Sequence, residues 1–130
     1  NNNPGILDYQ DAVIGPITYD LVSLLRDCYI SLSDNLLNDL VLDFYSKIDF
    51  SIRKNITKQS FIKFFDLMGI QRHLKAVGIF SRLMHRVAKN NYLKDIPRTL
   101  NYLYEVSIKY PELSFLTDFV ADQCLDYGDQ

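Results

Sequence analysis

Apolar residues recur every three or four positions along most of the chain, a pattern typical of amphipathic helices. A first helix is predicted from Thr18, which is an N-cap candidate. After a polar break at residues 31–34, Ser33 or Asp34 can cap a second helix. The apolar stripe of this second helix comprises Leu36, Leu37, Leu40, Val41, Phe44 and Ile48. Residues 52–55 are interpreted as a polar connector.

A third helical stretch begins at Thr57 and runs towards Lys89, and it contains Gly69 and Gly78. Inside a helix, glycine costs about 1 kcal/mol relative to alanine. The apolar positions also change phase near Gly69, so the sequence predicts a kink or break there. The apolar positions before this point are Phe61, Phe64, Phe65 and Met68, and those after it are Ile70, Leu74, Val77, Phe80 and Met84.

Two further helices are predicted in the last third of the chain. Asp95 can cap a fourth helix that carries Pro97 in its first turn, where a missing N–H does little harm. The apolar stripe of this helix comprises Ile96, Leu100, Leu103, Tyr104, Val106 and Ile108. A break at Tyr110 and Pro111 precedes a last helix. The predicted fold class is therefore mainly α, with about five helices.

The segment 5–9 departs from the helical pattern and is typical of one short N-terminal β-strand. No comparable strand lies near it in the sequence, and an unpaired buried strand leaves its backbone polar groups unsatisfied. We expect its pairing partners in a segment that precedes this chain. The alternative is an extended arm packed on the helices.

The composition excludes several function classes. The 130 residues carry a formal net charge of −2, which disfavours a strongly basic nucleic-acid binder. Aspartates interrupt every apolar window long enough to span a bilayer, so no membrane helix is expected. Cys28 and Cys124 stand far apart, without the spacing of a disulfide framework or zinc site, as in reduced cytoplasmic proteins.

The charge is unevenly distributed along the chain. Residues 1–50 carry two basic and eight acidic side chains, and residues 111–130 carry five acidic and no basic ones. Residues 51–110 carry twelve basic and three acidic side chains. A cationic middle favours an anionic ligand or an acidic partner surface. Neutralisation between the segments of the chain itself is the alternative.

Two carboxylates near the predicted strand are metal-ligand candidates. Asp8 lies near the end of the strand, and Asp11 follows within one turn. Carboxylate oxygens suit Mg²⁺, which keeps several water or phosphate ligands besides them. Aspartates directly after a strand are also common turn formers, so the spacing alone leaves both interpretations open.

The sequence Leu-Asp-Tyr-Gln-Asp-Ala at 7–12, followed by Gly-Pro-Ile-Thr-Tyr-Asp-Leu at 15–21, resembles the aminoglycoside phosphotransferase and choline kinase superfamily. The blocks Gln-Arg-His-Leu-Lys at 71–75 and Gly-Ile-Phe-Ser-Arg-Leu at 78–83 are similar to one of its subgroups. That subgroup comprises bacterial anomeric sugar kinases of cell-wall recycling, which phosphorylate N-acetylmuramate and N-acetylglucosamine. The resemblance covers nearly the whole chain.

The resemblance implies a kinase-like fold and a role for several residues. Asp8 matches the aspartate that holds Mg²⁺ against the phosphates of ATP, and Asp11 lies close enough to be a second ligand. Asp20 matches an aspartate that braces the catalytic loop through its backbone. In place of the subgroup's Arg-Asp-Gly-Lys-like turn, this chain has His-Arg-Val-Ala-Lys at 85–89, so no role is carried over to Arg86 or Lys89.

The resemblance also implies that residues 1–130 are a partial C-terminal lobe. The Gly-rich loop, the nucleotide-binding lysine and the His-x-Asp-x-x-x-x-Asn catalytic loop precede Asp8 in the family, and none is present here. We therefore expect the missing N-terminal part to be the partner of this chain, and the chain alone to lack kinase activity. The alternatives are a kinase for another small alcohol, such as an aminoglycoside or choline, and a non-catalytic helical interaction module.

The segment 71–82 is the candidate wall of an acceptor pocket. Lys75 and Arg82 share one helix face with Arg86 and Lys89, and Gly78 leaves room on that face. N-acetylmuramate carries a lactyl carboxylate, an anion that a guanidinium can bind with two hydrogen bonds. Arg72 and Arg82 are the first candidates for this contact, followed by His73. A solvated basic face, or ion pairs to the acidic segments, is the alternative.

Overall fold

The computed structural model describes residues 13–27, 31–87 and 96–128. The structure confirms a mainly helical fold. The predicted strand at 5–9 lies outside the described residues, as do Asp8 and Asp11. The elements in chain order are α1 (Tyr19–Leu25), α2 (Asp34–Lys47), α3 (Phe50–Arg53), α4 (Lys58–Val87), α5 (Ile96–Ser107), the 3₁₀ turn η2 (Pro111–Leu113) and α6 (Ser114–Gly128).

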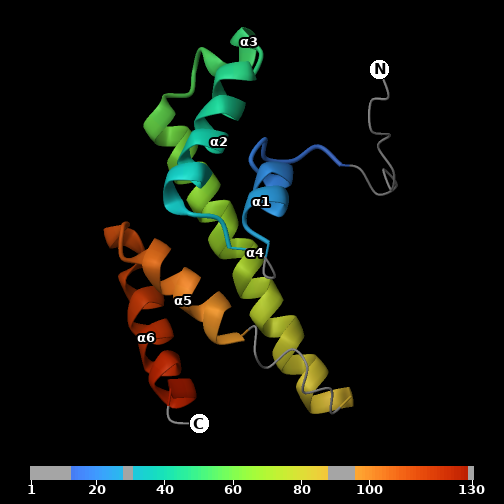
Figure 1. Ribbon diagram of the computed structural model, residues 1–130, viewed down its shortest axis with the longest axis vertical. Coiled ribbons are helices and arrows are strands. Elements are labelled where there is room, and N and C mark those ends of the chain that lie inside the picture. The colour runs from blue at the N-terminus through green and yellow to red at the C-terminus, as the bar shows by residue number, and fades with distance from the viewer. Residues whose placement is uncertain (1–12, 28–30, 88–95, 129–130) are drawn as a thin grey trace.

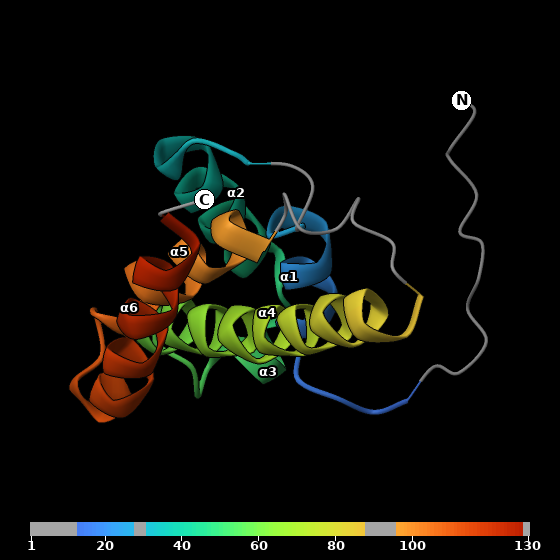
Figure 2. The ribbon, with the colours of Figure 1, turned by 90° about the horizontal axis from the view of Figure 1, so that it is seen from below.

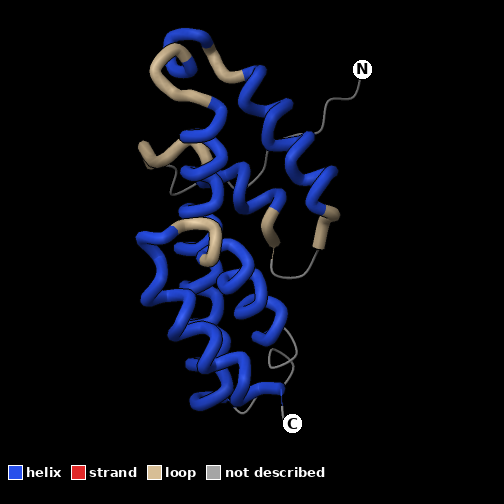
Figure 3. Tube along the Cα trace, turned by 90° about the vertical axis from the view of Figure 1, so that its left-hand side faces the viewer, coloured by secondary structure: helices blue, strands red, loops and turns tan. Residues whose placement is uncertain are grey.

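Helix α4 is the central helix of the fold. Its 30 residues run as one long helix through the length of the fold (Figure 1). Helix α2 lies beside its first half, α1 and α5 lie beside its middle, and α6 packs on α5 (Figures 1 and 2). Short loops join most of the helices in the described part of the chain (Figure 3). One long helix therefore carries two separate sets of partners.

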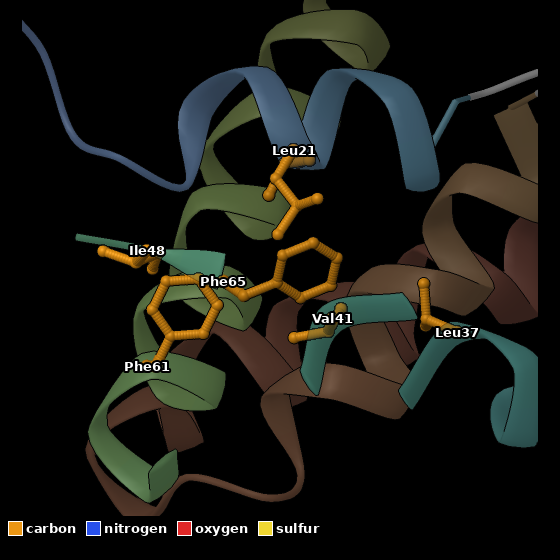
Figure 4. Packing of buried hydrophobic residues seen from close by; sticks show 7 residues of the cluster. Leu21, Leu37, Val41, Ile48, Phe61 and Phe65 are labelled. Atoms are coloured by element: carbon orange, nitrogen blue, oxygen red, sulfur yellow. The ribbon is translucent and has the colours of Figure 1, made fainter. Parts of the chain in front are cut away.

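The first hydrophobic cluster lies between α1, α2 and the first half of α4. Phe65 of α4 lies between Leu21 of α1 and Val41 of α2, and Phe61 packs below it (Figure 4). Both phenylalanines are almost fully buried. The buried members of this cluster are Leu21, Val22, Leu37, Val41, Ile48, Phe61 and Phe65.

The second hydrophobic cluster lies between the other half of α4, α5 and α6. Its buried members are Ile70, Phe80, Ile96, Leu100, Leu103, Val106 and Val120. The hydroxyls of Ser107 in α5 and Thr117 in α6 lie 3.0 Å apart and connect these two helices beside the cluster.

The predicted kink at Gly69 is wrong, because α4 continues through this residue without a break. The change in apolar phase marks a change of partners: Phe61 and Phe65 face the first cluster, whereas Ile70 and Phe80 face the second. Gly69 itself is buried, and the Tyr102 side chain of α5 occupies the space that a Cβ atom would need. The glycine thus permits a close approach of α5 and not a bend.

The predicted helix starts at Thr18 and Ser33 are found in position, and the predicted cap Asp95 lies outside the described residues. Thr18 is the N-cap of α1, but its hydroxyl donates to the carbonyl of Phe64 in α4, 3.5 Å away, and does not cap. Ser33 caps α2 by accepting a hydrogen bond from the N–H of Leu36. The predicted polar connector at 52–55 is partly helical, because Asp49 caps the single-turn helix α3 through the N–H of Ser51, 2.7 Å away.

The break at Tyr110 and Pro111 is confirmed, since η2 begins at Pro111. Pro97 is the second residue of α5, as expected for the first helical turn. The predicted stripe of α5 is correct except at Tyr104 and Ile108, which are exposed. Ile108 follows the last residue of the helix. The buried face of the helix also includes Thr99 and Ser107.

We predict that Gly69→Ala destabilises the full-length protein although alanine favours the helix. The new methyl group overlaps the Tyr102 hydroxyl, so either α5 or the tyrosine has to move. Gly78→Ala is the matched control in the same helix. It should stabilise the protein by up to about 1 kcal/mol, because no atom lies within 4 Å of the added carbon.

Urea unfolding of both variants measures this difference. Tyr102→Phe should relieve part of the Gly69→Ala defect, since it removes the atom that is overlapped most. Equal changes in the free energy of unfolding for Gly69→Ala and Gly78→Ala would contradict a close helix contact at Gly69.

Candidate functional site

A buried polar cluster lies where the two halves of the fold meet. Arg26, the C-cap residue of α1, places its guanidinium 3.6 Å from a carboxylate oxygen of Asp66 in α4. The same guanidinium lies 4.4 Å from the ring centroid of Tyr102 and 5.7 Å from that of Phe65. Two aromatic rings and one carboxylate therefore surround this cation, which compensates for its loss of water.

The Asp66 carboxylate contacts two other parts of the chain, Arg26 at the end of α1 and Tyr110 at the start of η2. Asp66 is 4% exposed, and its other carboxylate oxygen accepts a hydrogen bond of 2.8 Å from the Tyr110 hydroxyl. Burial, followed by this hydrogen bond and the negative charge of Asp66, raises the pKa of Tyr110 well above its usual range. Tyr110 therefore stays a hydroxyl donor, and the pair fixes the start of η2 against α4.

His73 is a buried neutral histidine. Its Nδ1 lies 2.8 Å from the carbonyl oxygen of Gly69, and its ring centroid lies 4.1 Å from that of Tyr102. A carbonyl can only accept, so Nδ1 carries the proton and Nε2 of the neutral ring is a hydrogen-bond acceptor. Burial lowers the pKa of His73, and the positive charges of Arg26 and Arg72 lower it further against the opposing effect of the Gly69 carbonyl and Asp27.

Two adjoining hollows lie between α1 and α4, and we call them the inner and the outer hollow. The inner hollow is lined by Ser23, Arg26, Asp27, Arg72, His73, Ala76, Ile79 and Phe80. The outer hollow is lined by Tyr19, Gln71, Arg72, Lys75, Ala76 and Ile79. They share Arg72, Ala76 and Ile79, so together they form one groove along α4 with Arg72 in its middle.

Arg72 is held in this groove by Tyr19, whose ring centroid lies 4.7 Å from the guanidinium carbon. An aromatic ring attracts a cation but does not accept directional hydrogen bonds as a carboxylate does. The guanidinium thus keeps donors that can bind an anion or a hydroxyl group.

The structure brings some of the sequence-predicted site residues together and separates others. Arg72 and His73 line the inner hollow side by side. Arg82 lies further along α4, is exposed, and is not among the residues that line either hollow. Asp20 is exposed in the first turn of α1. Asp8 and Asp11 are outside the described residues, so their metal assignment stays a prediction from the resemblance.

Four residues of the groove were missed by the sequence analysis, and all of them belong to α1 or its C-terminal end: Tyr19, Ser23, Arg26 and Asp27. A signal for Arg26 exists, because it is one of only two basic residues among the first fifty. A lone cation in an acidic segment, directly after an apolar stripe, favours a buried ion pair over a solvated side chain.

The described residues contain no cluster of three or more His, Cys, Asp or Glu side chains that could hold a metal ion. Of the helices in the described ranges, none is long and apolar enough to cross a membrane. One ion pair, between Lys63 and Glu112, joins the cationic middle to the acidic end.

Comparison with known proteins places this chain beside a class of sugar kinases. It is 45% identical to a protein of Neisseria meningitidis serogroup B over 96% of its own length. It is 40% and 39% identical to proteins of Pseudomonas putida and Pseudomonas aeruginosa, in each case over 92% of its length. All three relatives are named N-acetylmuramate/N-acetylglucosamine kinase.

The chain spans little more than a third of these relatives: 39% of the first and 36% of the other two. No family model matches the sequence. No solved structure matches it significantly. The similarity therefore concerns one part of the sequence of these relatives.

We predict that Asp66→Ala destabilises the full-length protein by about 3–5 kcal/mol, because it leaves the buried Arg26 guanidinium without its carboxylate. Glu112→Ala is the matched control, since it removes a carboxylate from an exposed ion pair with Lys63 and should have little effect. Chemical denaturation measures both. A similar small change for the two variants would show that the buried pair is not required.

We also predict that His73 makes the protein less stable in acid. The pKa of His73 is lowered on folding, so below its ordinary value of 6.5 the unfolded chain takes up a proton that the folded chain resists. The free energy of unfolding should therefore fall as the pH drops below 6.5. His73→Gln should flatten this dependence between about pH 8 and pH 5.5. Identical pH profiles for wild type and His73→Gln would contradict it.

Proposed function

We propose that the full-length protein that contains this chain is an ATP-dependent sugar kinase. It transfers the γ-phosphoryl group of ATP to the anomeric hydroxyl of N-acetylmuramate and N-acetylglucosamine, as part of cell-wall recycling in the cytoplasm. The observation that carries the proposal is the 45% identity, over 96% of the chain, to a protein named as a kinase for these two sugars.

The nucleotide side of the reaction rests on the resemblance. Asp8 is proposed as the Mg²⁺ ligand, with Asp11 as the candidate second ligand, and the metal would neutralise charge on the transferred phosphoryl group. Asp20 is proposed to brace the catalytic loop supplied by the rest of the protein. Its exposure in the first turn of α1 supports this role, since the carboxylate is accessible to another segment.

The α1–α4 groove is proposed as the sugar side. The Ser23 hydroxyl and the Asp27 carboxylate offer hydrogen-bonding oxygens of the kind that sugar hydroxyls need. Phe80 and Ile79 add apolar surface beside them. His73 Nε2 can accept one further hydrogen bond, because Nδ1 is occupied by the Gly69 carbonyl.

The test is turnover of the full-length protein with ATP and each sugar, with the product identified by phosphorus NMR as a sugar 1-phosphate. Asp8→Ala should lower kcat by several orders of magnitude, because charge stabilisation by a bound metal is a large part of phosphoryl-transfer catalysis. Asp34→Ala, which removes an exposed carboxylate from the start of α2, is the matched control and should keep wild-type turnover.

Two results would overturn the proposal. Phosphorylation of an aminoglycoside or choline, with neither amino sugar accepted, would assign the protein to another small-alcohol kinase. Absence of turnover with all of these acceptors would favour a non-catalytic helical interaction module. Near-normal turnover by Asp8→Ala would instead remove Asp8 from the metal site alone.

A further inference from the structure

The two hollows of the α1–α4 groove differ in charge although they share one wall. In the inner hollow, the Asp27 carboxylate accompanies Arg26 and Arg72. In the outer hollow, Arg72 and Lys75 are the charged lining residues, and none of the lining residues is acidic. A negatively charged group is therefore favoured on the outer side of Arg72 and opposed by Asp27 on the inner side.

Arg72 and Lys75 are three residues apart in one helix, so their side chains leave α4 on the same face. Tyr19 fixes the Arg72 guanidinium from the opposite wall, at 4.7 Å from ring centroid to guanidinium carbon. Gln71 adds an amide to the same hollow. A pre-positioned guanidinium beside a second cation and an amide donor is a suitable receptor for a carboxylate, which accepts paired hydrogen bonds.

We propose that the outer hollow binds the carboxylate of an acidic sugar, and that Arg72 and Lys75 are the residues that distinguish N-acetylmuramate from N-acetylglucosamine. This inference rests on the proposed function. N-acetylmuramate is N-acetylglucosamine with a lactyl ether, so the two sugars share their ring hydroxyls and differ by one carboxylate.

The shared wall explains how one site accepts both sugars. The ring lies in the inner hollow, where Ser23 and Asp27 meet its hydroxyl groups, and the lactyl arm passes Arg72 into the outer hollow. N-acetylglucosamine fills the inner hollow alone. The carboxylate contact therefore adds affinity for N-acetylmuramate alone.

The experiment is calorimetric binding of each sugar to the full-length protein without ATP, for the wild type, Arg72→Met and Lys75→Met. Arg72→Met should raise the Kd for N-acetylmuramate about tenfold or more, the usual effect of losing a charge-assisted hydrogen bond, and raise that for N-acetylglucosamine by a clearly smaller factor. Lys75→Met should act in the same direction with a smaller effect. Arg72→Lys should retain part of the preference, because it keeps the charge but loses the paired donors.

Lys58→Met is the matched control, since it removes an exposed cation at the other end of the same helix and should change neither Kd. Unfolding curves of each variant exclude loss of fold as the cause. Equal weakening of both sugars by Arg72→Met, or no change for N-acetylmuramate, would overturn the carboxylate assignment. Wild-type turnover of the two sugars decides the kinase proposal separately, since binding is measured without nucleotide.

If the wild type transfers no phosphate but binds N-acetylmuramate through Arg72, the kinase proposal fails and the carboxylate site stands. If the wild type phosphorylates N-acetylglucosamine and does not bind N-acetylmuramate, the carboxylate site fails and a sugar kinase remains.

Discussion

The contact between the two halves of the fold depends on one largely buried cation, the guanidinium of Arg26. It is in contact with Phe65 from the first hydrophobic cluster, with Tyr102 beside the second, and with the Asp66 carboxylate between them. A charge removed from water is tolerated only where such partners replace its hydration. Besides the continuous helix α4, this polar contact connects the two halves of the structure, whereas each half is held internally by apolar packing. Arg26 also lines the inner hollow, beside His73, so the contact between Arg26 and Asp66 contributes to the shape of the groove.

The fold was predictable from the sequence where the controlling signals are local. Apolar spacing located the main helices, and Ser33 and Pro111 marked a start and a break as expected, because caps and prolines act within one turn. Gly69 was misinterpreted because its role depends on Tyr102, more than thirty positions away in the sequence. Change of phase in a helical stripe has two physical causes, a bend or a new partner, and only tertiary contacts distinguish them.

The candidate site was predictable to a smaller extent. Arg72 and His73 were predicted to line an acceptor pocket within the segment 71–82, and the structure places both on the groove. Arg82 has the same chemistry but lies elsewhere along α4, since helical periodicity gives the face of a residue and not the extent of a cavity. The opposite wall, Tyr19 and Arg26, could not be paired with Arg72 and Asp66 from the sequence, because the pairing depends on how α1 crosses α4.

The contact between Tyr102 and Gly69 also determines the register of α5 along α4. A slide of one helical turn would bring the Tyr102 ring towards Phe65 or His73, positions that already carry large buried side chains. The next glycine of α4, Gly78, lies nine residues further on, about 13 Å along the helix axis. This distance is too large for the Tyr102 ring to pack on Gly78 after a slide of one turn. A missing side chain at one position of a long, otherwise regular helix thus excludes neighbouring alignments, and α5 and α6 can dock in one place only.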